Sequence, residues 1–253
     1  MSKILVIAQN TFKQAIRDKI LYGILVFALL FLGSTVILGA LSLGEDVFII
    51  KSFGLAGIYI FNIIITVFLG ASIVYEEVEK KTTYFLLSKP VTKLDLLVAK
   101  FIGLFEAVSL TTLLMTVVYI LVVWINQGGF DYLALCAVLF QLLEMGILIG
   151  LIILFSIFTT PLAATIYTIL VLYIGHLLTL IKGLATKTGG VFEYLLMIIY
   201  YIFPNLEKFN IRNMTIHQSS ITPLEFIFSL AYALFYIIIS LCIANVLFSR
   251  KEL

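Results

Sequence analysis

Three polar side chains interrupt long apolar stretches of this chain, and each could bind a substrate or exchange protons there. Glu144 lies near the middle of residues 132–158, and Gln141 lies one turn earlier on the same face of the predicted helix. His176 lies toward the end of residues 161–181. Stretches of about 20 apolar residues cross membranes, and a carboxylate at mid-membrane costs about 2.5–3.5 kcal/mol. Glu144 is therefore expected to face protein or water.

Two roles fit these residues. Glu144, Gln141 and His176 could line a path or a charge-sensitive gate across the membrane, or Glu144 could be a protonated, hydrogen-bonded packing residue. Catalysis has no comparable support, because the apolar stretches contain no paired carboxylates, no His-Glu-x-x-His motif and no Ser/His constellation. His176 is distant in sequence from His217, and no cysteine lies near either, so no metal site is indicated. We expect no catalytic residue, bound metal or cofactor on this chain.

The elements that hold these side chains follow from composition. Hydrophobic residues make up 62% of the 253 residues and charged residues 12%, whereas soluble domains have about 45–50% and about 25%. A soluble globule and a disordered chain are thus excluded, and a net charge of +2 gives no reason to expect nucleic acid as a partner. Six stretches are long and apolar enough to span a lipid bilayer, approximately 21–43, 53–74, 98–125, 132–158, 161–181 and 224–248. Their continuous apolarity predicts helices and no barrel, and hence an all-α, polytopic membrane protein of one domain.

The positions of lysine and arginine predict how the spans are oriented. Eleven of the sixteen basic residues lie before the first span, between spans two and three, or after the last span. The other five lie in the opposite connections and are Lys51, Lys182, Lys187, Lys208 and Arg212. Because cytoplasmic connections collect basic residues, both termini are predicted to be cytoplasmic, in the inner (plasma) membrane of the cell.

Two segments outside the spans are also predicted to be helical. Residues 2–19 place apolar and basic side chains on opposite faces, which is typical of a helix lying in the cytoplasmic membrane interface. In the outer connection 182–223, the apolar run 194–203 is too short to span comfortably and ends at Pro204. This run predicts a re-entrant or interfacial helix before the last span.

Local signals mark where helices start, turn and pack. Thr92 is a predicted N-cap with Asp95 at the third helical position, and Thr222 is a predicted N-cap with Glu225 in the first turn. The Gly189-Gly190 pair predicts a hinge at the entry to the short outer helix. Small residues in the spans predict close helix packing, at Gly33, Gly39, Gly70 and Ala71.

The connection 75–97 differs from an ordinary solvated loop. Acidic residues are followed by Lys80 and then by an apolar patch with helical spacing, which Pro90 ends. Because an exposed apolar patch usually meets a partner, we predict a short amphipathic helix that docks onto another protein. The predicted docking residues are Glu76, Glu77, Glu79, Lys80, Thr82, Thr83, Tyr84, Leu86 and Leu87.

This connection resembles that of the membrane subunit of type-2 ABC exporters. The shared pattern is Glu77-x-Glu79, then Thr82 or Thr83, then Leu86-Leu87-Ser88-x-Pro90-Val91, then Lys100. The six spans, the amphipathic first helix and the short helix before the last span match as well. The resemblance implies a permease whose cytoplasmic loop carries a coupling helix that docks into an ATPase.

The resemblance also implies partners. The chain has no Gly-x-x-x-x-Gly-Lys-Ser/Thr phosphate loop, so ATP and Mg²⁺ are expected on a separate ATPase subunit, present in two copies. The family works with two membrane halves, which implies a second copy of this chain in a homodimer, or a paralogue. A narrower resemblance, to the permeases grouped with multi-copper enzyme maturation and nitrous-oxide-reductase maturation, rests on residues 156–164, Gly175-His176 and 204–210.

Two other functions remain open. One is an ion-coupled secondary transporter in which Glu144 titrates, which predicts transport driven by a proton gradient without nucleotide. The other is a scaffold for envelope assembly that transports nothing. The sequence identifies no substrate.

Overall fold

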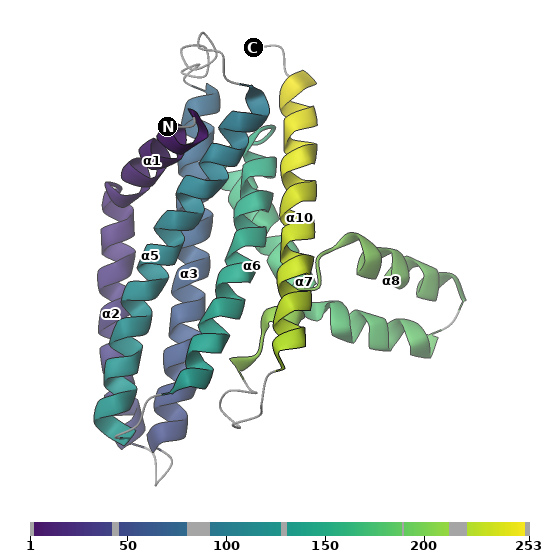
Figure 1. The fold of residues 1–253 in the computed structure, drawn as a ribbon. Coiled ribbons are helices and arrows are strands. Elements are labelled where there is room, and N and C mark those ends of the chain that lie inside the picture. Colours follow the sequence, from purple (N-terminus) through teal and green to yellow (C-terminus); the bar gives the residue numbers. More distant parts are fainter. Residues whose placement is uncertain are drawn as a thin grey trace.

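The computed structural model describes residues 3–41, 46–79, 92–127, 131–188, 190–212 and 222–250, and in these ranges every regular element is a helix (Figure 1). The helices are α1 (Lys3–Ile16), α2 (Lys19–Ala40), α3 (Asp46–Glu79), α5 (Lys93–Gln127), α6 (Tyr132–Ser156), α7 (Pro161–Thr188), α8 (Gly190–Ile202), the 3₁₀ helix η1 (Leu206–Phe209) and α10 (Pro223–Arg250). Six of them, α2, α3, α5, α6, α7 and α10, are long and apolar enough to cross a membrane. The predicted all-α, polytopic fold class is therefore confirmed.

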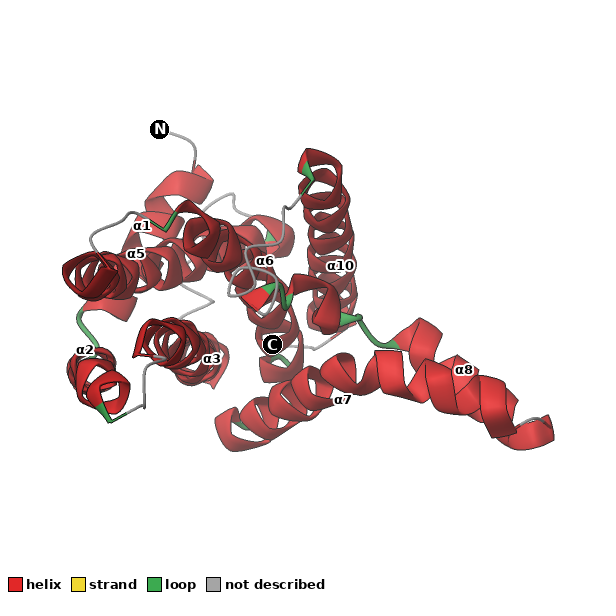
Figure 2. Ribbon diagram, turned by 90° about the horizontal axis from the view of Figure 1, so that it is seen from below, coloured by secondary structure: helices red, strands yellow, loops and turns green. Residues whose placement is uncertain are grey.

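Helix α6 forms the centre of the bundle. It packs against α3, α5, α7, η1 and α10, and 67% of its most apolar stretch is buried. Seen along the bundle, α2 and α10 lie at the periphery (Figure 2), where only 22% and 11% of the corresponding stretches are buried. The outer helices thus present long apolar faces to lipid or to another chain.

Close helix packing is confirmed at two of the predicted glycines. A Cβ atom added at Gly70 of α3 would lie 2.5 Å from Ile152 of α6, and one at Gly39 would lie 2.9 Å from Ile50. The prediction for Gly33 is wrong, because this residue is exposed and an added Cβ would meet nothing within 4 Å. Gly33 lies outside the stripe by which α2 contacts the bundle. The buried residues of that stripe are Leu21, Ala28, Leu32, Thr35 and Gly39.

The two predicted N-caps are confirmed as reciprocal capping boxes. Thr92 and Asp95 exchange two backbone-to-side-chain hydrogen bonds of 3.1 Å at the start of α5. At the start of α10, the Thr222 N–H donates to Glu225 Oε2 at 3.0 Å, and the Glu225 N–H donates to Thr222 Oγ1 at 3.4 Å. Each box satisfies backbone N–H groups that have no partner within the helix.

Helix α1 packs along the first half of α5. The buried side chains of α1 are small, namely Ala8, Thr11 and Ala15. They lie over Gly103 of α5, where an added Cβ would contact the Ala8 carbonyl oxygen and lie 2.7 Å from Thr11 Cβ. The predicted amphipathic helix is thus also a packed part of the bundle. Figure 1 places α1 and the last turn of α10 at the same end of the bundle, as six crossings require.

Helices α7 and α8 form a hairpin that projects from the side of the bundle (Figures 1 and 2). Helix α7 continues to Thr188, beyond the predicted end of the fifth span at 181. The chain then reverses at Gly190, whose φ of +69° favours glycine. Helix α8 has 13 residues and none is buried, so it corresponds to the predicted short helix that does not span. Gly189, the other half of the predicted hinge, lies outside the described residues.

Candidate functional site

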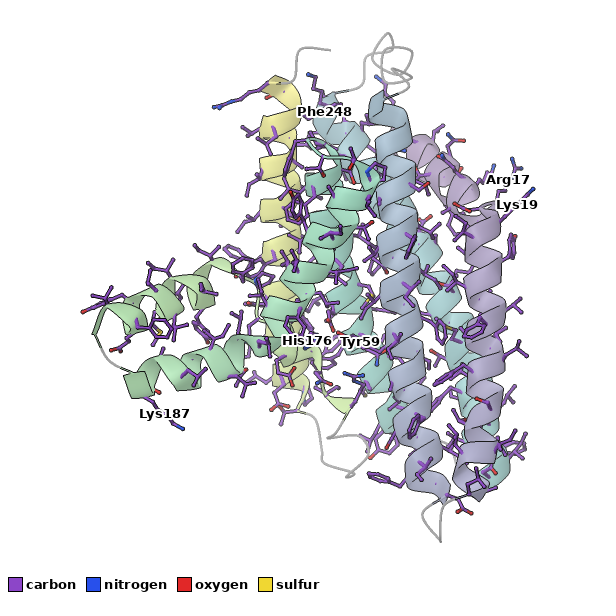
Figure 3. The ribbon with its side chains drawn as sticks, turned by 180° about the vertical axis from the view of Figure 1, so that it is seen from behind. Arg17, Lys19, Tyr59, His176, Lys187 and Phe248 are labelled. Atoms are coloured by element: carbon purple, nitrogen blue, oxygen red, sulfur yellow. The ribbon has the colours of Figure 1, made fainter. Side chains whose placement is uncertain are left out.

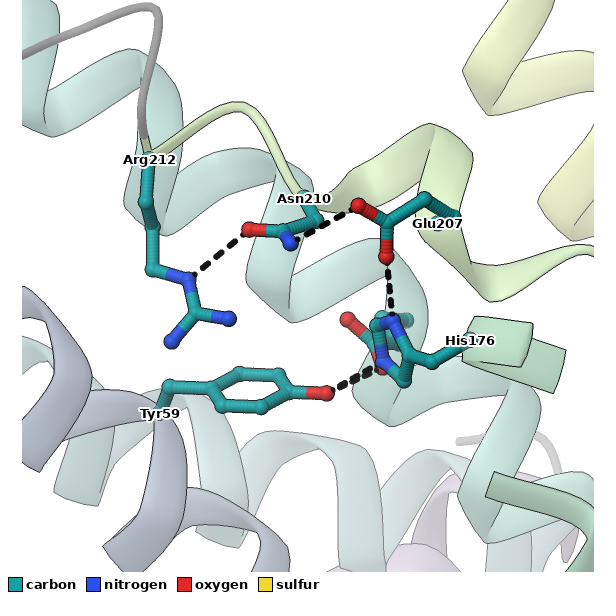
Figure 4. Close-up of polar contacts among 6 residues, drawn as sticks. Tyr59, His176, Glu207, Asn210 and Arg212 are labelled. Atoms are coloured by element: carbon teal, nitrogen blue, oxygen red, sulfur yellow. Dashed lines mark hydrogen bonds and ion pairs between the residues drawn. The ribbon is translucent and has the colours of Figure 1, made fainter. Parts of the chain in front are cut away.

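Three spans bring polar side chains together inside the bundle. Tyr59 of α3 and His176 of α7 point toward each other (Figures 3 and 4). The Tyr59 hydroxyl donates to Glu144 Oε1 of α6 at 2.7 Å and lies 2.6 Å from His176 Nε2. His176 Nε2 is in turn 2.9 Å from Glu144 Oε1. The sequence predicts that Glu144 faces protein or water, and in the structure it faces protein, through Tyr59 and His176.

The segment around η1 completes this cluster from the other side of His176. Its approach depends on Gly175, where an added Cβ would lie 2.8 Å from both the Pro204 carbonyl oxygen and Leu206 Cγ. Because glycine leaves this space free, η1 lies against α7 and Glu207 Oε2 is 2.8 Å from His176 Nδ1. The residue before the histidine thus determines whether Glu207 can reach it.

Two further residues close the cluster into a ring (Figure 4). Asn210 Nδ2 donates to Glu207 Oε1 at 3.1 Å, and Arg212 Nε donates to Asn210 Oδ1 at 2.9 Å. The Arg212 guanidinium lies over the Tyr59 ring, with its Cζ 4.3 Å from the ring centroid. Such a cation–π contact is worth about 2 kcal/mol when it is shielded from water. We refer to Tyr59, Glu144, His176, Glu207, Asn210 and Arg212 as the polar cluster.

Hydrogen-bond geometry limits where the protons of the polar cluster can lie. The single Tyr59 hydroxyl proton is donated to Glu144, so it cannot also fill the contact with His176 Nε2. Both imidazole nitrogens face carboxylate oxygens, at 2.9 Å and 2.8 Å. With both carboxyl groups ionised, both nitrogens donate, and His176 is then an imidazolium between two carboxylates. Together with Arg212, the cluster then holds two positive and two negative charges.

Burial is graded along the cluster. The Glu144 side chain is 1% exposed, the His176 side chain 21% and the Glu207 side chain 40%. A fully buried carboxylate is thus linked through one imidazole to a carboxylate at the surface. This arrangement can hold α3, α6, α7 and η1 together, or it can pass a proton between the interior of the bundle and its surface.

The third predicted path residue lies apart from the cluster. Gln141 is one turn before Glu144 and its Nε2 donates to the Leu55 carbonyl oxygen of α3 at 3.4 Å. The amide is 1% exposed, and its Oε1 has no hydrogen-bond partner among the described residues. Gln141 therefore links α6 to α3, and no hydrogen bond joins its side chain to the polar cluster within the described residues.

Four members of the polar cluster are not among the predicted site residues: Tyr59, Glu207, Asn210 and Arg212. From the sequence, residues 204–210 carry only a family resemblance, and Arg212 is only one of the basic residues in the outer connection. The sequence did carry a signal for the residues after α8. A polar stretch directly after an apolar helix needs hydrogen-bond partners for its polar groups, and the bundle can supply them. Tyr59, one tyrosine among thirteen, carries no such signal.

The predicted docking residues lie mostly outside the described residues. Glu76, Glu77 and Glu79 belong to the last turns of α3, and residues 80–91 follow beyond the described range. The prediction of a docking helix is therefore not tested. Within the described ranges, no group of three or more His, Cys, Asp or Glu side chains could hold a metal ion.

Replacing Tyr59 by phenylalanine is expected to lower the free energy of unfolding by about 1.5–3 kcal/mol, because Glu144 loses a donor that cannot be replaced by water. Reversible unfolding in mixed detergent micelles measures this loss. Tyr119→Phe is the matched control, since the buried Tyr119 hydroxyl has no hydrogen-bond partner in the described part of the chain. Equal losses for the two variants would contradict the assigned hydrogen bond.

Comparison with protein families decides the class of this bundle. The family described as ABC-2 family transporter protein matches residues 5–253, nearly the whole chain. The chain belongs to the ABC-2 transporter family. It is thus a membrane permease subunit of an ABC transporter and is not itself catalytic, and ABC-2 permeases normally work with an ATPase subunit. No curated protein matches the chain.

Proposed function

We propose that this ABC-2 permease is the membrane half of an ATP-driven exporter, and that it lies in the inner membrane with both termini in the cytoplasm. Family membership over residues 5–253 carries the proposal. The excess of basic residues in the connections at one end of the bundle supports the orientation, since α1, the end of α3 and the start of α5 all lie there (Figure 1). The narrower resemblance of this chain to multi-copper enzyme maturation permeases stays a prediction.

We further propose that two copies of the chain, or this chain and a paralogue, form the translocation path between them. The supporting observation is the low burial of the peripheral spans, with 11% in α10, 22% in α2 and 28% in α7. Small or apolar side chains on such faces allow one bundle to pack against another within the bilayer. Two ATPase subunits, which would hold ATP and Mg²⁺, complete the assembly.

In this proposal the polar cluster is the gate on the outer side. His176 holds Glu207 through one hydrogen bond, and Glu207 holds η1 against α7. Hydrogen bonds and ion pairs of this kind can break and re-form together. The close-packed apolar side chains around them do not deform gradually, so the bundle switches between distinct packings. The bundle with the His176–Glu207 contact and the bundle without it would then be two conformational states. The ATPase would shift the equilibrium between them.

The cytoplasmic connection between α3 and α5 is proposed to receive the motion of the ATPase. Helix α5 begins at Lys93, directly after this connection, and α1 packs on α5. A push on the connection would therefore move α5 and α1 together. Helix α6, which packs on α5 and carries Glu144, would transmit the movement toward the gate.

Replacing both Leu86 and Leu87 by aspartate is expected to abolish co-purification of the ATPase while the permease still inserts, because charge disrupts an apolar docking contact. Co-expression with a phosphate-loop ATPase subunit that co-purifies with the wild-type permease, followed by affinity purification in mild detergent, measures the retained ATPase. Gln9→Asp combined with Asn10→Asp is the control, since it adds the same two charges at exposed positions of α1 at the same end of the bundle. Undiminished ATPase recovery from the double variant would show that docking occurs elsewhere.

Ion-coupled transport is the second candidate, and one observation favours it. The imidazolium of His176 joins buried Glu144 to half-exposed Glu207, which is a possible route for a proton. Purified protein in vesicles distinguishes the two functions. Transport driven by a proton gradient without nucleotide would support ion coupling, whereas dependence on ATP and the ATPase subunit would support the exporter.

A further inference from the structure

A groove of about 580 Å³ lies between α6, η1 and the first turns of α10. This volume is in the range of about 300–1,000 Å³ that is usual for small-molecule sites. The apolar part of its lining consists of Phe140, Ile211, Phe228, Tyr232 and Phe235. Phe228 and Phe235 are 65% and 59% exposed on a spanning helix, so the groove opens toward the place where lipid chains lie.

Opposite charges lie in the same groove. Lys208 Nζ is 4.3 Å from the centroid of the Tyr232 ring, and that ring is held in place because the Tyr232 hydroxyl accepts a hydrogen bond of 2.7 Å from the Asn205 N–H. Glu225 is fixed by the capping box at the start of α10. In the described part of the chain, no ion pair joins Lys208 and Glu225, and both side chains are exposed, so each can still meet a ligand group of opposite charge.

We propose that this groove binds a zwitterionic amine phospholipid of the surrounding bilayer. Its phosphate would meet the Lys208 ammonium, its own ammonium would meet the Glu225 carboxylate, and an acyl chain would lie along the aromatic lining. An anionic phospholipid without an amine would leave Glu225 facing like charge, and a soluble zwitterion would leave the aromatic lining uncovered. The site does not depend on what the permease transports, so it holds whether or not the exporter proposal is correct.

The test uses purified protein reconstituted into vesicles of equal parts phosphatidylethanolamine and phosphatidylglycerol. Native mass spectrometry then counts the lipids of each kind that stay bound to the protein. Wild type is expected to retain phosphatidylethanolamine preferentially. Lys208→Gln should weaken retention of both lipids by about tenfold, because both carry the phosphate. Glu225→Gln should remove the preference alone, since glutamine can still cap the Thr222 N–H through its side-chain oxygen.

Two controls match these changes. Lys182 also lies over a tyrosine ring, with its Nζ 5.1 Å from the centroid of Tyr200, but it lies outside the groove. Lys182→Gln should therefore leave lipid retention unchanged, and Glu193→Gln on α8 should do the same. Thermal unfolding of all four variants is expected to stay close to wild type. Lys182, Lys208 and Glu225 are exposed, a lysine–tyrosine contact at an exposed site is worth only about 0.5–1 kcal/mol, and glutamine can still cap the Thr222 N–H.

Three results would overturn the proposal. The first is equal retention of the two lipids by wild type, and the second is an equal effect of Lys208→Gln and Lys182→Gln. The third is evidence that a second copy of the chain, and not a lipid, occupies the groove. If Phe228→Cys, in a protein whose Cys136 and Cys242 are replaced by alanine, forms a disulfide between two copies in the membrane, the groove is covered by protein.

Discussion

Replacing His176 by leucine is expected to lower the free energy of unfolding by about 3–5 kcal/mol, the usual effect of breaking a buried ion pair. The His176 imidazole contacts both Glu144 and Glu207, one through each ring nitrogen. Without it, the Tyr59 hydroxyl is the hydrogen-bond donor that remains to the 1% exposed Glu144 carboxylate among the described residues. The variant must either bury an unpaired charge or take up a proton, and both are unfavourable.

Reversible unfolding in mixed micelles measures this loss, and a double-mutant cycle identifies its cause. His176→Leu combined with Glu144→Leu removes the charge and its partner together, so the double variant should be more stable than the sum of the two single losses predicts. Strict additivity of the two losses would show that the two side chains do not interact. Figure 4 shows why Glu207 must be considered as well, since it contacts the other nitrogen of the same ring.

Glu144→Gln separates the two roles that remain open for this residue. Glutamine keeps an oxygen that accepts from Tyr59 but removes the negative charge. If Glu144 is a packing residue, nucleotide-driven export should be largely retained by a folded variant. If its charge belongs to the gate, export by the folded protein should fall, and the variant should also unfold more easily because His176 loses one of its two carboxylate partners.

Replacing Gly103 by leucine is expected to separate α1 from α5 and to lower the free energy of unfolding by at least about 1–3 kcal/mol, the usual cost of overpacking. The obstacle is the backbone, because an added Cβ would contact the Ala8 carbonyl oxygen, and a backbone carbonyl cannot rotate away as a side chain can. If α1 transmits motion from the cytoplasmic side, this variant should also lose export.

Cysteine labelling detects the separation directly. Ala8 is 1% exposed, so Ala8→Cys, in a protein without Cys136 and Cys242, should resist a water-soluble maleimide. The same cysteine should react when Gly103→Leu is added. Gly33→Leu is the matched control, because an added Cβ there meets nothing within 4 Å. Protection of the cysteine in both variants would mean that α1 tolerates the larger side chain.

The sequence by itself determined the features that depend on one segment of chain. The six spans follow from the length and apolarity of each run, and the capping boxes at Thr92 and Thr222 follow from residues three positions apart. The short helix α8 follows in the same way from a run too short to span. Hydrophobic burial and local hydrogen bonding suffice for these features, since neither requires knowledge of which helix neighbours which.

Only the tertiary structure decided which polar groups meet. Tyr59 and His176 are 117 residues apart in sequence, and His176 and Glu207 are 31 apart. Their contact depends on how the helices rotate and pack, which is also why Gly70 faces a neighbouring helix and Gly33 does not. In a bilayer, apolar faces are nearly equivalent because lipid and protein are both apolar, so hydrophobicity cannot specify these rotations. Close packing at glycines and paired charges such as those of the polar cluster can specify them.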